Sequence, residues 1–164
     1  MTKLRLLSIT LAAVTALAIN SPAQDSPAKS TNVPAIKPTK KQADFASTTA
    51  QFGKIAKTNE VYQSALDAHA LADALKLTGK EGAFKGTVVR IFEPRNLAIL
   101  NFDANYRTAM TAVVHGPNFA DFPVLTNLIG KDVVITGTFT DYQGRAQMVL
   151  TNAAQVKVVE AETK

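Results

Sequence analysis

Arginines and aromatic residues recur close together between residues 90 and 145. Aromatic rings stack on nucleic-acid bases and guanidinium groups pair with phosphates, so this combination is typical of surfaces that bind single-stranded nucleic acid. The predicted ligand-binding residues are Arg90, Arg95, Phe102, Tyr106, Arg107, Tyr142 and Arg145. In the competing structural interpretation, Phe92 and Phe102 are core residues, the tyrosines pack at turns and the arginines are solvated. The short loops around these residues favour the structural interpretation, and the sequence leaves both open.

Combinations of residues suited to catalysis or metal binding are hard to find in the chain. His69 and His115 have no second histidine at ligand spacing, and the sequence contains no cysteine, which argues against a zinc site. Asp103-Ala-Asn105 begins like a calcium loop but lacks the following glycine and the distal glutamate, so it predicts a turn. No nucleophile elbow, phosphate loop or dinucleotide fingerprint occurs. We therefore predict a protein without enzymatic activity, metal or cofactor.

The stretch 79–159 must position these side chains, and its pattern is that of a small β-barrel. Five runs with β character are separated by clusters of Gly, Pro, Asn or Asp, and they span 82–92, 97–102, 107–115, 133–140 and 146–151. Residues 133–140 alternate with a period of two, which points Val133, Ile135, Gly137 and Phe139 inward and leaves Val134 outward. The pattern predicts a mainly β protein with five strands.

The connections between these runs carry their own signals. Gly86 lies inside the first run and predicts a bend or bulge there. Apolar residues at spacings of three and four over 118–129 predict a short helix, which Pro123 should delay or break. Asp141-Tyr-Gln-Gly144 predicts a tight hairpin turn with Gly144 at a positive φ.

This order of elements resembles a known group of domains. The residues that carry the resemblance are Gly79-Lys-Glu, Gly86-Thr-Val, Leu100-Asn-Phe, Thr111-Ala-Val-Val, Gly130-Lys-Asp-Val-Val-Ile-Thr-Gly137, Tyr142-Gln-Gly and Gln155-Val. They resemble the oligonucleotide/oligosaccharide-binding (OB) domains of the tRNA-anticodon-binding-like group, as found in exported bacterial proteins of unassigned role. The resemblance covers about half of the chain and implies a five-stranded OB-fold barrel with a helix between strands three and four. It reflects barrel geometry and turn chemistry, and it specifies no ligand.

Exported OB-fold nucleases of the thermonuclease kind offer an enzymatic alternative. They need a carboxylate cluster, a general-base glutamate and two arginines, for which the chain offers Asp103, Asp121 and Asp141 with Arg95 and Arg107. Glu93 is the only glutamate after Glu81 in the predicted barrel, and the spacing does not match those families. A nuclease is therefore the least favoured function.

The first half of the chain has a different character. Lys3, Arg5 and the apolar run 6–19 predict a signal peptide over 1–23, which is too short to serve as a membrane span. Residues 24–42 predict a disordered Pro/Lys-rich linker, and the Ala-rich residues 43–78 predict a helical extension whose second helix covers about 60–77, capped by Thr58 or Asn59. A polar tail follows at 160–164. These features predict an exported monomer, periplasmic or secreted, with no transmembrane segment in the mature chain.

The charge of the chain is unevenly distributed. The whole sequence carries a formal net charge of +5, but from Asp44 onward twelve basic residues oppose twelve acidic ones. A neutral domain lacks the general attraction to phosphates unless its charges are segregated. We therefore expect a non-enzymatic binding module for single-stranded nucleic acid or a similar oligomeric ligand. The alternative is a structural or protein- or glycan-interaction domain of the cell envelope.

Overall fold

The computed structural model describes residues 41–47 and 49–161. The predicted signal peptide over 1–23, linker residues 24–40 and tail residues 162–164 lie outside the described residues. Within the described ranges, no helix has both the length and the apolar character that a membrane crossing requires.

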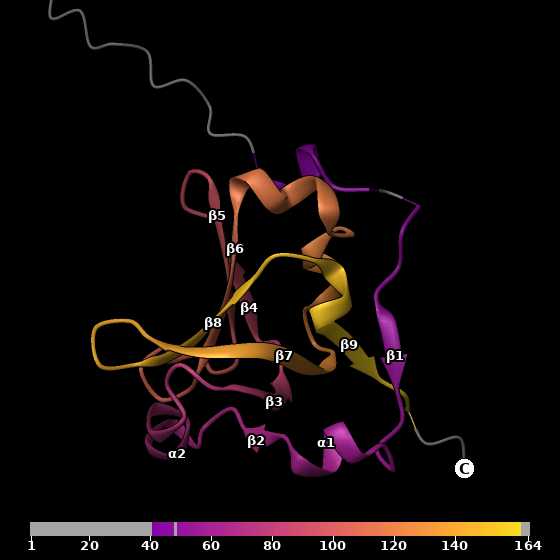
Figure 1. Ribbon diagram of the computed structural model, residues 1–164. Helices are drawn as coiled ribbons and strands as arrows, with labels where there is room; N and C mark the ends of the chain where they lie inside the picture. Colours follow the sequence, from indigo (N-terminus) through magenta and orange to yellow (C-terminus); the bar gives the residue numbers. More distant parts are fainter. Residues whose placement is uncertain (1–40, 48, 162–164) are drawn as a thin grey trace, which may run out of the picture. The chain divides into compact units, whose positions relative to one another are not determined.

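The described chain is mainly β, in agreement with the predicted fold class (Figure 1). Its strands are β1 (Gly53–Ile55), β2 (Leu66–Asp67), β3 (Glu81–Thr87), β4 (Arg90–Phe92), β5 (Leu97–Asn101), β6 (Thr111–His115), β7 (Asp132–Asp141), β8 (Ala146–Leu150) and β9 (Val156–Val159). Its helices are α1 (Glu60–Ser64) and α2 (Leu71–Lys76), with 3-10 turns η1 (Gln42–Asp44), η2 (Gly116–Asp121), η3 (Leu125–Leu128) and η4 (Ala153–Gln155). The prediction of five strands is therefore wrong, because the described ranges contain nine.

The strands form one curled mixed sheet with the shape of a half-barrel (Figure 1). The sheet runs in the order β1-β9-β7-β8-β6-β5-β4, and β3 pairs with β7 on one side and with β2 on the other. β6 and β8 are parallel, whereas β4, β5 and β6 form an antiparallel meander. The short strands β1 and β2 come from the segment predicted to be helical.

The predicted first strand is divided into β3 and β4, with only Val88 and Val89 between them. The Val88 N–H donates to the Lys131 carbonyl at 3.0 Å, and the next N–H, of Val89, donates to the Asn101 carbonyl at 2.9 Å. The chain thus changes pairing partner from β7 to β5 at this bend. Gly86 lies two residues earlier, where a Cβ would come within 2.9 Å of the Ala68 Cβ, so close packing explains this glycine.

The predicted helix over 60–77 is wrong in its middle part. α1 ends at Ser64, and β2 then pairs with β3 before α2 begins. The backbone of Ala68 explains the interruption, since its N–H donates to the Lys85 carbonyl at 2.8 Å and its carbonyl accepts from Met110 at 2.7 Å. These tertiary bonds replace helical ones. The predicted cap is confirmed at Asn59, whose side chain accepts from the Val61 N–H at 2.9 Å.

The helix predicted over 118–129 is broken, as Pro123 indicates. η2 and η3 flank the sequence Phe122-Pro-Val, and the buried side chain of Gln42 satisfies the backbone at the break. Its amide nitrogen donates to the Pro123 carbonyl at 3.1 Å, and its Oε1 accepts from the Leu125 N–H at 3.0 Å. The described N-terminal end of the chain is thereby fixed to η2 and η3.

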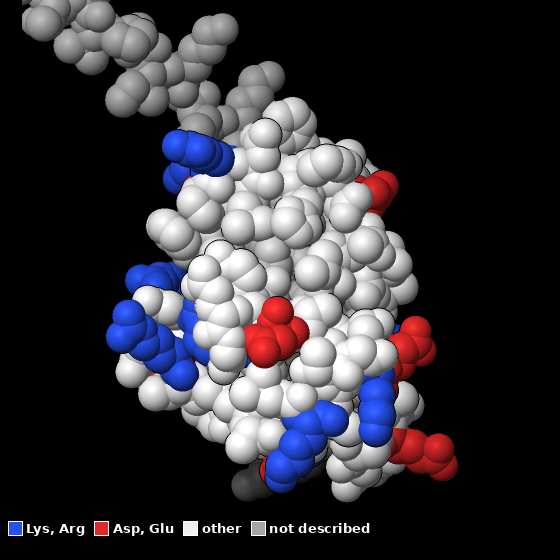
Figure 2. Space-filling model, turned by 60° about the vertical axis from the view of Figure 1, so that its left-hand side comes forward, with Lys and Arg blue, Asp and Glu red and all other residues white. Residues whose placement is uncertain are grey.

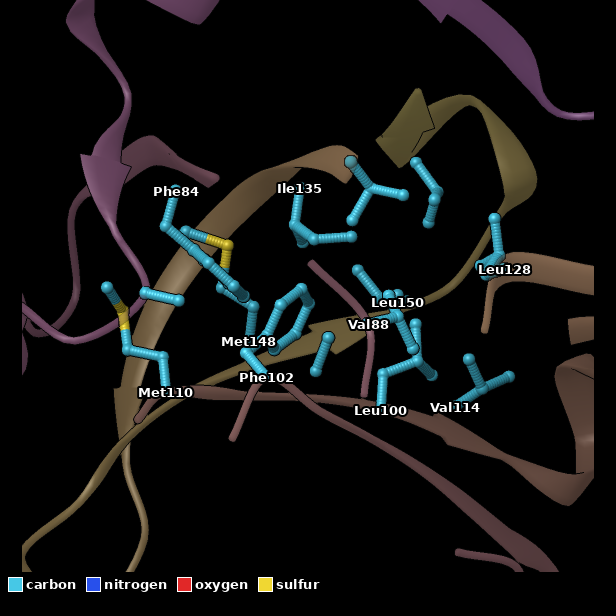
Figure 3. Close-up of a cluster of buried hydrophobic side chains, with 14 of the residues drawn as sticks. Phe84, Val88, Leu100, Phe102, Met110, Val114, Leu128, Ile135, Met148 and Leu150 are labelled. Atoms are coloured by element: carbon cyan, nitrogen blue, oxygen red, sulfur yellow. The ribbon is translucent and has the colours of Figure 1, made fainter. Parts of the chain in front are cut away.

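The core lies inside the curled sheet, where Phe84, Leu100 and Met148 belong to one buried cluster (Figure 3). The predicted inward positions Val133, Ile135 and Phe139 are buried. Val134, predicted to point outward, is also fully buried, because it packs in a second cluster with Ile55 of β1 and Ala65 beside α1. The N-terminal segment therefore covers the outer side of β7.

Candidate ligand-binding groove

A row of polar side chains crosses the outer face of the sheet from β4 to β8. The strand register places four residues opposite one another on adjacent strands, namely Arg90, Asn101, Thr111 and Gln147. The residues next to them in the chain, such as Leu100 and Met148, point into the core. Since side chains alternate between the faces of a strand, the polar row must lie outside.

This row forms the floor of a groove of about 450 Å³. Its lining residues are Arg90, Phe92, Ile99, Asn101, Tyr106, Thr111, Tyr142, Arg145 and Gln147. The residues Phe92, Tyr106 and Tyr142 are 52%, 40% and 51% exposed, so the core does not account for them. The groove thus offers three aromatic faces above a polar floor.

The turn between β7 and β8 holds Tyr142 and Arg145 at one end of the groove. Each of these two residues donates its N–H to the carbonyl of the other, at 2.9 and 3.2 Å. Gln143 and Gly144 both have a positive φ, of 55° and 77°, as a two-residue hairpin turn of this hand requires. The Asp141 carboxylate accepts from the Gly144 N–H at 2.7 Å. The predicted tight turn, with Gly144 at a positive φ, is confirmed.

Residues 103–109, between β5 and β6, carry Tyr106. Asp103 accepts from the Asn105 N–H at 2.7 Å, and Asn105 accepts from the Arg107 N–H at 3.2 Å. These bonds confirm the predicted turn at Asp103-Ala-Asn105. The loop is also tied to the neighbouring hairpin, since the Arg145 guanidinium donates to the Tyr106 carbonyl at 3.4 Å and lies 4.9 Å from its ring centroid.

Arg107 contacts Tyr106 from within the same loop. Its Nε donates to the Tyr106 hydroxyl at 3.3 Å, and its guanidinium lies 5.6 Å from the ring centroid. This hydrogen bond, together with the positive charges of Arg107 and Arg145, lowers the pKa of the Tyr106 phenol below its usual value. Tyr106 is therefore held between two loops by cation–π contacts and hydrogen bonds.

His69 connects the N-terminal segment to the loop of Tyr106. Its Nδ1 lies 2.9 Å from Asp67 Oδ1 and its Nε2 lies 3.1 Å from Asp103 Oδ2. Hydrogen bonds to Asp67 and Asp103 raise the pKa of His69. The pKa of Asp67 is lowered, mainly by the hydrogen bond from the His69 backbone N–H. The pKa of Asp103 is also lowered, mainly by the hydrogen bond from the Asn105 backbone N–H. The two carboxylates lie at opposite nitrogens of the ring, and the described residues contain no metal-ligand cluster.

The structure brings four of the seven predicted residues together: Arg90, Tyr106, Tyr142 and Arg145 line the groove. Arg107 lies in an adjoining hollow, whereas Arg95 lies in the β4–β5 loop, outside the groove lining. Phe102 is 3% exposed and stacks edge-on against Phe84 at 5.0 Å, so its prediction as a ligand contact is wrong. The β5–β6 loop begins after this residue, and its ring fills the core.

Sequence reasoning missed five lining residues: Phe92, Ile99, Asn101, Thr111 and Gln147. Phe92 was assigned to the core in the structural interpretation, yet it is exposed. The sequence held one signal for the polar floor: polar Gln147 stands between apolar Ala146 and Met148, which indicates that its side chain points outward. Only the strand register shows that these polar residues share one row.

Within residues 41–47 and 49–161, the arginines at the groove have no acidic partners. No carboxylate of the described residues forms an ion pair with Arg90, Arg107 or Arg145. Figure 2 shows Lys and Arg side chains on the left flank and also along the bottom and lower right of its view, with acidic side chains at the centre and on the right. The charges of this neutral domain are thus partly segregated on this view of the molecule.

No protein-family model matches the chain, and no curated protein matches it. Among solved structures, one match is described as "OBody AM1L10 bound to hen egg-white lysozyme", with 15% sequence identity and a TM-score of 0.39. The match covers 52% of this chain and 84% of that chain. A likeness of this size carries no argument about fold or function.

Proposed function

We propose that this protein is a non-enzymatic OB-fold binding module that holds single-stranded nucleic acid in the groove above β5 and β6. The pairing of the long strands supports the OB assignment: β3 and β4 act as one bent strand, β5 and β6 follow as a meander, and β8 lies parallel to β6. OB folds bind ligands on the face of their second and third strands, beside the loop between the fourth and fifth. In this order of strands, that face is the face of the groove.

The observation that carries the proposal is the combination of exposed rings and unpaired arginines in one groove. Phe92, Tyr106 and Tyr142 can each stack on a base, a contact worth about 1–3 kcal/mol for each base. Arg90 and Arg145 lie at the same groove and pair with no carboxylate in the described part of the chain, so they are available for phosphates. The core explains none of these five side chains, of which only Arg145 is partly buried.

The polar floor fits base edges. Thr111 and Gln147 can donate and accept hydrogen bonds, as base edges require, and both are partly exposed. Asn101 is nearly buried, and its amide nitrogen donates to the Ile99 carbonyl at 3.2 Å, so it supports the floor. The floor extends over β4, β5, β6 and β8, which at about 4.8 Å between strands is roughly 14 Å. We therefore expect a short site of about four nucleotides, at the lower end for this fold.

The charge of the domain sets the expected salt dependence. Three arginines at or beside the groove can neutralise about three phosphates, and single strands give a slope near −0.7 for each phosphate. We expect a slope of about −2 in a plot of log affinity against log salt concentration. Binding should therefore be moderate in affinity and should survive at moderate salt.

Fluorescence anisotropy with labelled single-stranded DNA and RNA tests the proposal. Arg90→Gln should weaken binding and reduce the salt slope by about 0.7. Arg95→Gln is the matched control, because it removes the same charge from a loop outside the groove. Equal losses in the two variants would show that net charge, not the groove, holds the ligand. Absence of binding at high micromolar protein and low salt would refute the proposed function.

A neutral glycan of the cell envelope is the second candidate ligand. The aromatic residues of the groove are also suited to sugar rings, and the amide side chains of its floor are suited to sugar hydroxyls. The domain as a whole is neutral, as a site for a neutral glycan allows. Competition separates the two ligands: an unlabelled neutral oligosaccharide that displaces nothing, while an oligonucleotide of equal length competes, favours nucleic acid. A nuclease activity would appear as cleavage of plasmid or RNA with divalent metal, and we expect none.

Export remains part of the proposal and rests on the sequence of residues 1–23. Lys3 and Arg5 followed by an apolar run support a signal peptide. N-terminal sequencing of the protein recovered from periplasm and medium should show cleavage close to Ala23. Recovery of the uncleaved chain from the cytoplasm would contradict export.

A further inference from the structure

We propose that the hollow next to the groove, beyond Tyr106 and Arg145, is a phosphate subsite that binds the phosphate following the last stacked base. The inference rests on the proposed function and extends it, because it assigns a ligand group to a place outside the groove. Its lining residues are Tyr106, Arg107, Gln143 and Arg145.

The hollow adjoins the groove, and the two share part of their lining. It measures about 400 Å³, and it shares Tyr106 and Arg145 with the groove. These two side chains therefore form the partition between the two spaces. A strand whose base stacks on Tyr106 or Tyr142 has its next phosphate close to this partition, on the side of Arg107.

Two guanidinium groups lie beside the Tyr106 ring, and both arginines line the hollow. Arg145 lies 4.9 Å and Arg107 lies 5.6 Å from the centroid of the same Tyr106 ring. Like charges held near one another are unfavourable, and an anion that contacts both offsets the repulsion. Guanidinium groups also present paired N–H donors that match phosphate oxygens. The shared lining thus favours a phosphate in the hollow, where both arginines are exposed to it.

The carboxylates closest in the chain are occupied by other contacts. Asp141 accepts from the Gly144 N–H at 2.7 Å, and Asp103 accepts from the Asn105 N–H at 2.7 Å while it also contacts His69. Neither forms an ion pair with Arg107 or Arg145. The charges of both arginines are therefore left for a ligand.

The hairpin turn places a further donor at the hollow. Gln143 lies at the tip of the turn with a positive φ of 55°, and it is exposed and lines the hollow. An amide at this position can donate to a third phosphate oxygen. A carboxylate at the same position should repel the phosphate without removing either arginine.

Titration with inorganic phosphate and pyrophosphate tests the subsite directly. In NMR spectra of the arginine Nε–H groups, we expect Arg107 and Arg145 to shift at millimolar pyrophosphate while Arg95 stays in place. Arg107→Gln and Gln143→Glu should each suppress the response of Arg145. Equal shifts at Arg95, or no shifts at all, would overturn the subsite whether or not oligonucleotides bind.

A second measurement links the subsite to the groove. We compare a tetranucleotide without terminal phosphates with its 5′-phosphorylated, 3′-phosphorylated and one-nucleotide-longer forms. One phosphorylated form, or the longer form, should bind about three- to tenfold more tightly to the wild type, which corresponds to one hydrogen bond of typical net strength. Arg107→Gln should abolish this gain, whether or not the affinity for the plain tetranucleotide also changes, whereas Arg95→Gln should keep the gain.

The outcomes separate the two proposals. If no tetranucleotide binds, the proposed function fails, and the pyrophosphate titration alone decides the subsite. If the plain tetranucleotide binds in the groove and no added phosphate improves its affinity, the subsite is refuted and the groove stands. A gain that only the longer strand gives assigns the subsite to a backbone phosphate and not to a terminal one.

Discussion

The two faces of β4, β5, β6 and β8 are built from alternating residues of the same strands, and they carry side chains of different kinds. The inner face carries buried apolar side chains such as Leu100 and Met148, whereas the outer face carries the polar row from Arg90 to Gln147. One set of residues stabilises the fold and the other lines the groove. Because neighbours in the chain belong to different faces, the two tasks can be changed independently.

The outer side of the sheet is itself divided in two. On β7, the outward residue Val134 is covered by β1 and by the end of α1. On β5, the outward residue Ile99 lines the open groove. The N-terminal segment thus closes one part of the outer surface and leaves the other free. This selective covering supports the groove as the functional surface.

Leu100→Ala should have the largest effect of the changes that test the comparison of the two faces. Leu100 is fully buried on β5, so its truncation leaves a cavity and should cost about 2–5 kcal/mol of unfolding free energy. Urea denaturation followed by circular dichroism measures the loss. A cost below about 0.5 kcal/mol, the usual effect of surface changes, would show that the inner face is not the core.

Tyr142→Ala should give the opposite result on the outer face. The ring is half exposed, so the free energy of unfolding should change by no more than about 0.5 kcal/mol. Oligonucleotide affinity should fall by about 1–3 kcal/mol, the usual cost of losing one stacked base. Parallel denaturation and anisotropy titrations check both values, with exposed Val61→Ala of α1 as the control that should change neither.

Gly144→Ala should affect both properties, because the turn connects them. The site has no atom within 4 Å of an added Cβ, so the cost comes from the positive φ of 77° and should be about 1–2 kcal/mol. The strain should also displace Tyr142 and Arg145 and weaken binding. Gly53→Ala is the matched control, since its φ is not positive and its nearest atom lies 3.9 Å away. Similar losses in the two variants would argue against backbone strain.

The His69 contacts should give the smallest effect, visible as a pH dependence. Because the pKa of His69 is raised in the folded protein, the charged imidazole stabilises the fold fully below the ordinary pKa of 6.5. This stabilisation is lost as the pH rises through the raised pKa. Because the pKa values of Asp67 and Asp103 are lowered, the two carboxylates stabilise the fold above the ordinary pKa of 3.8. This stabilisation is lost as the pH falls through the lowered pKa values. The contacts therefore stabilise most between these limits.

His69→Gln tests this window. Thermal unfolding should show a lower midpoint than the wild type at about pH 5.5 and a smaller difference at about pH 8.5. The effect should be modest, because the side chains of His69 and Asp67 are 53% and 66% exposed and solvent screens them. His115→Gln, at the exposed end of β6, serves as the control. An equal difference at both pH values would contradict the role of the charged imidazole.

The parts of the fold with a strong local signal were predictable from the sequence. β7 and its turn followed from a period of two and from Asp141-Tyr-Gln-Gly144. β1 and β2, with three and two residues, are too short to show a period and depend on their partners β9 and β3. The long helix over 60–77 failed for the same reason, because apolar spacing does not reveal the backbone bonds of Ala68.

The candidate groove was predictable in its chemistry but not in its geometry. Residue type alone selected Arg90, Tyr106, Tyr142 and Arg145, which do line it. The bend at Val88 and Val89 interrupts the alternation of inward and outward residues between β3 and β4. The sequence therefore could not show that Phe92 is exposed. The polar floor required the register of four strands, which only tertiary pairing defines.

Mapping the bound ligand on the protein tests the central claim most directly. Two-dimensional amide and side-chain NMR spectra would be recorded while a four-nucleotide single strand is added. We expect the largest shifts at Thr111, Gln147 and Tyr142, with little change at Thr136, Asn152 and Gln155, which line a separate hollow of about 600 Å³ on the β3–β7 side. Shifts confined to that second hollow, or spread evenly over the basic surface, would contradict the groove as the binding site.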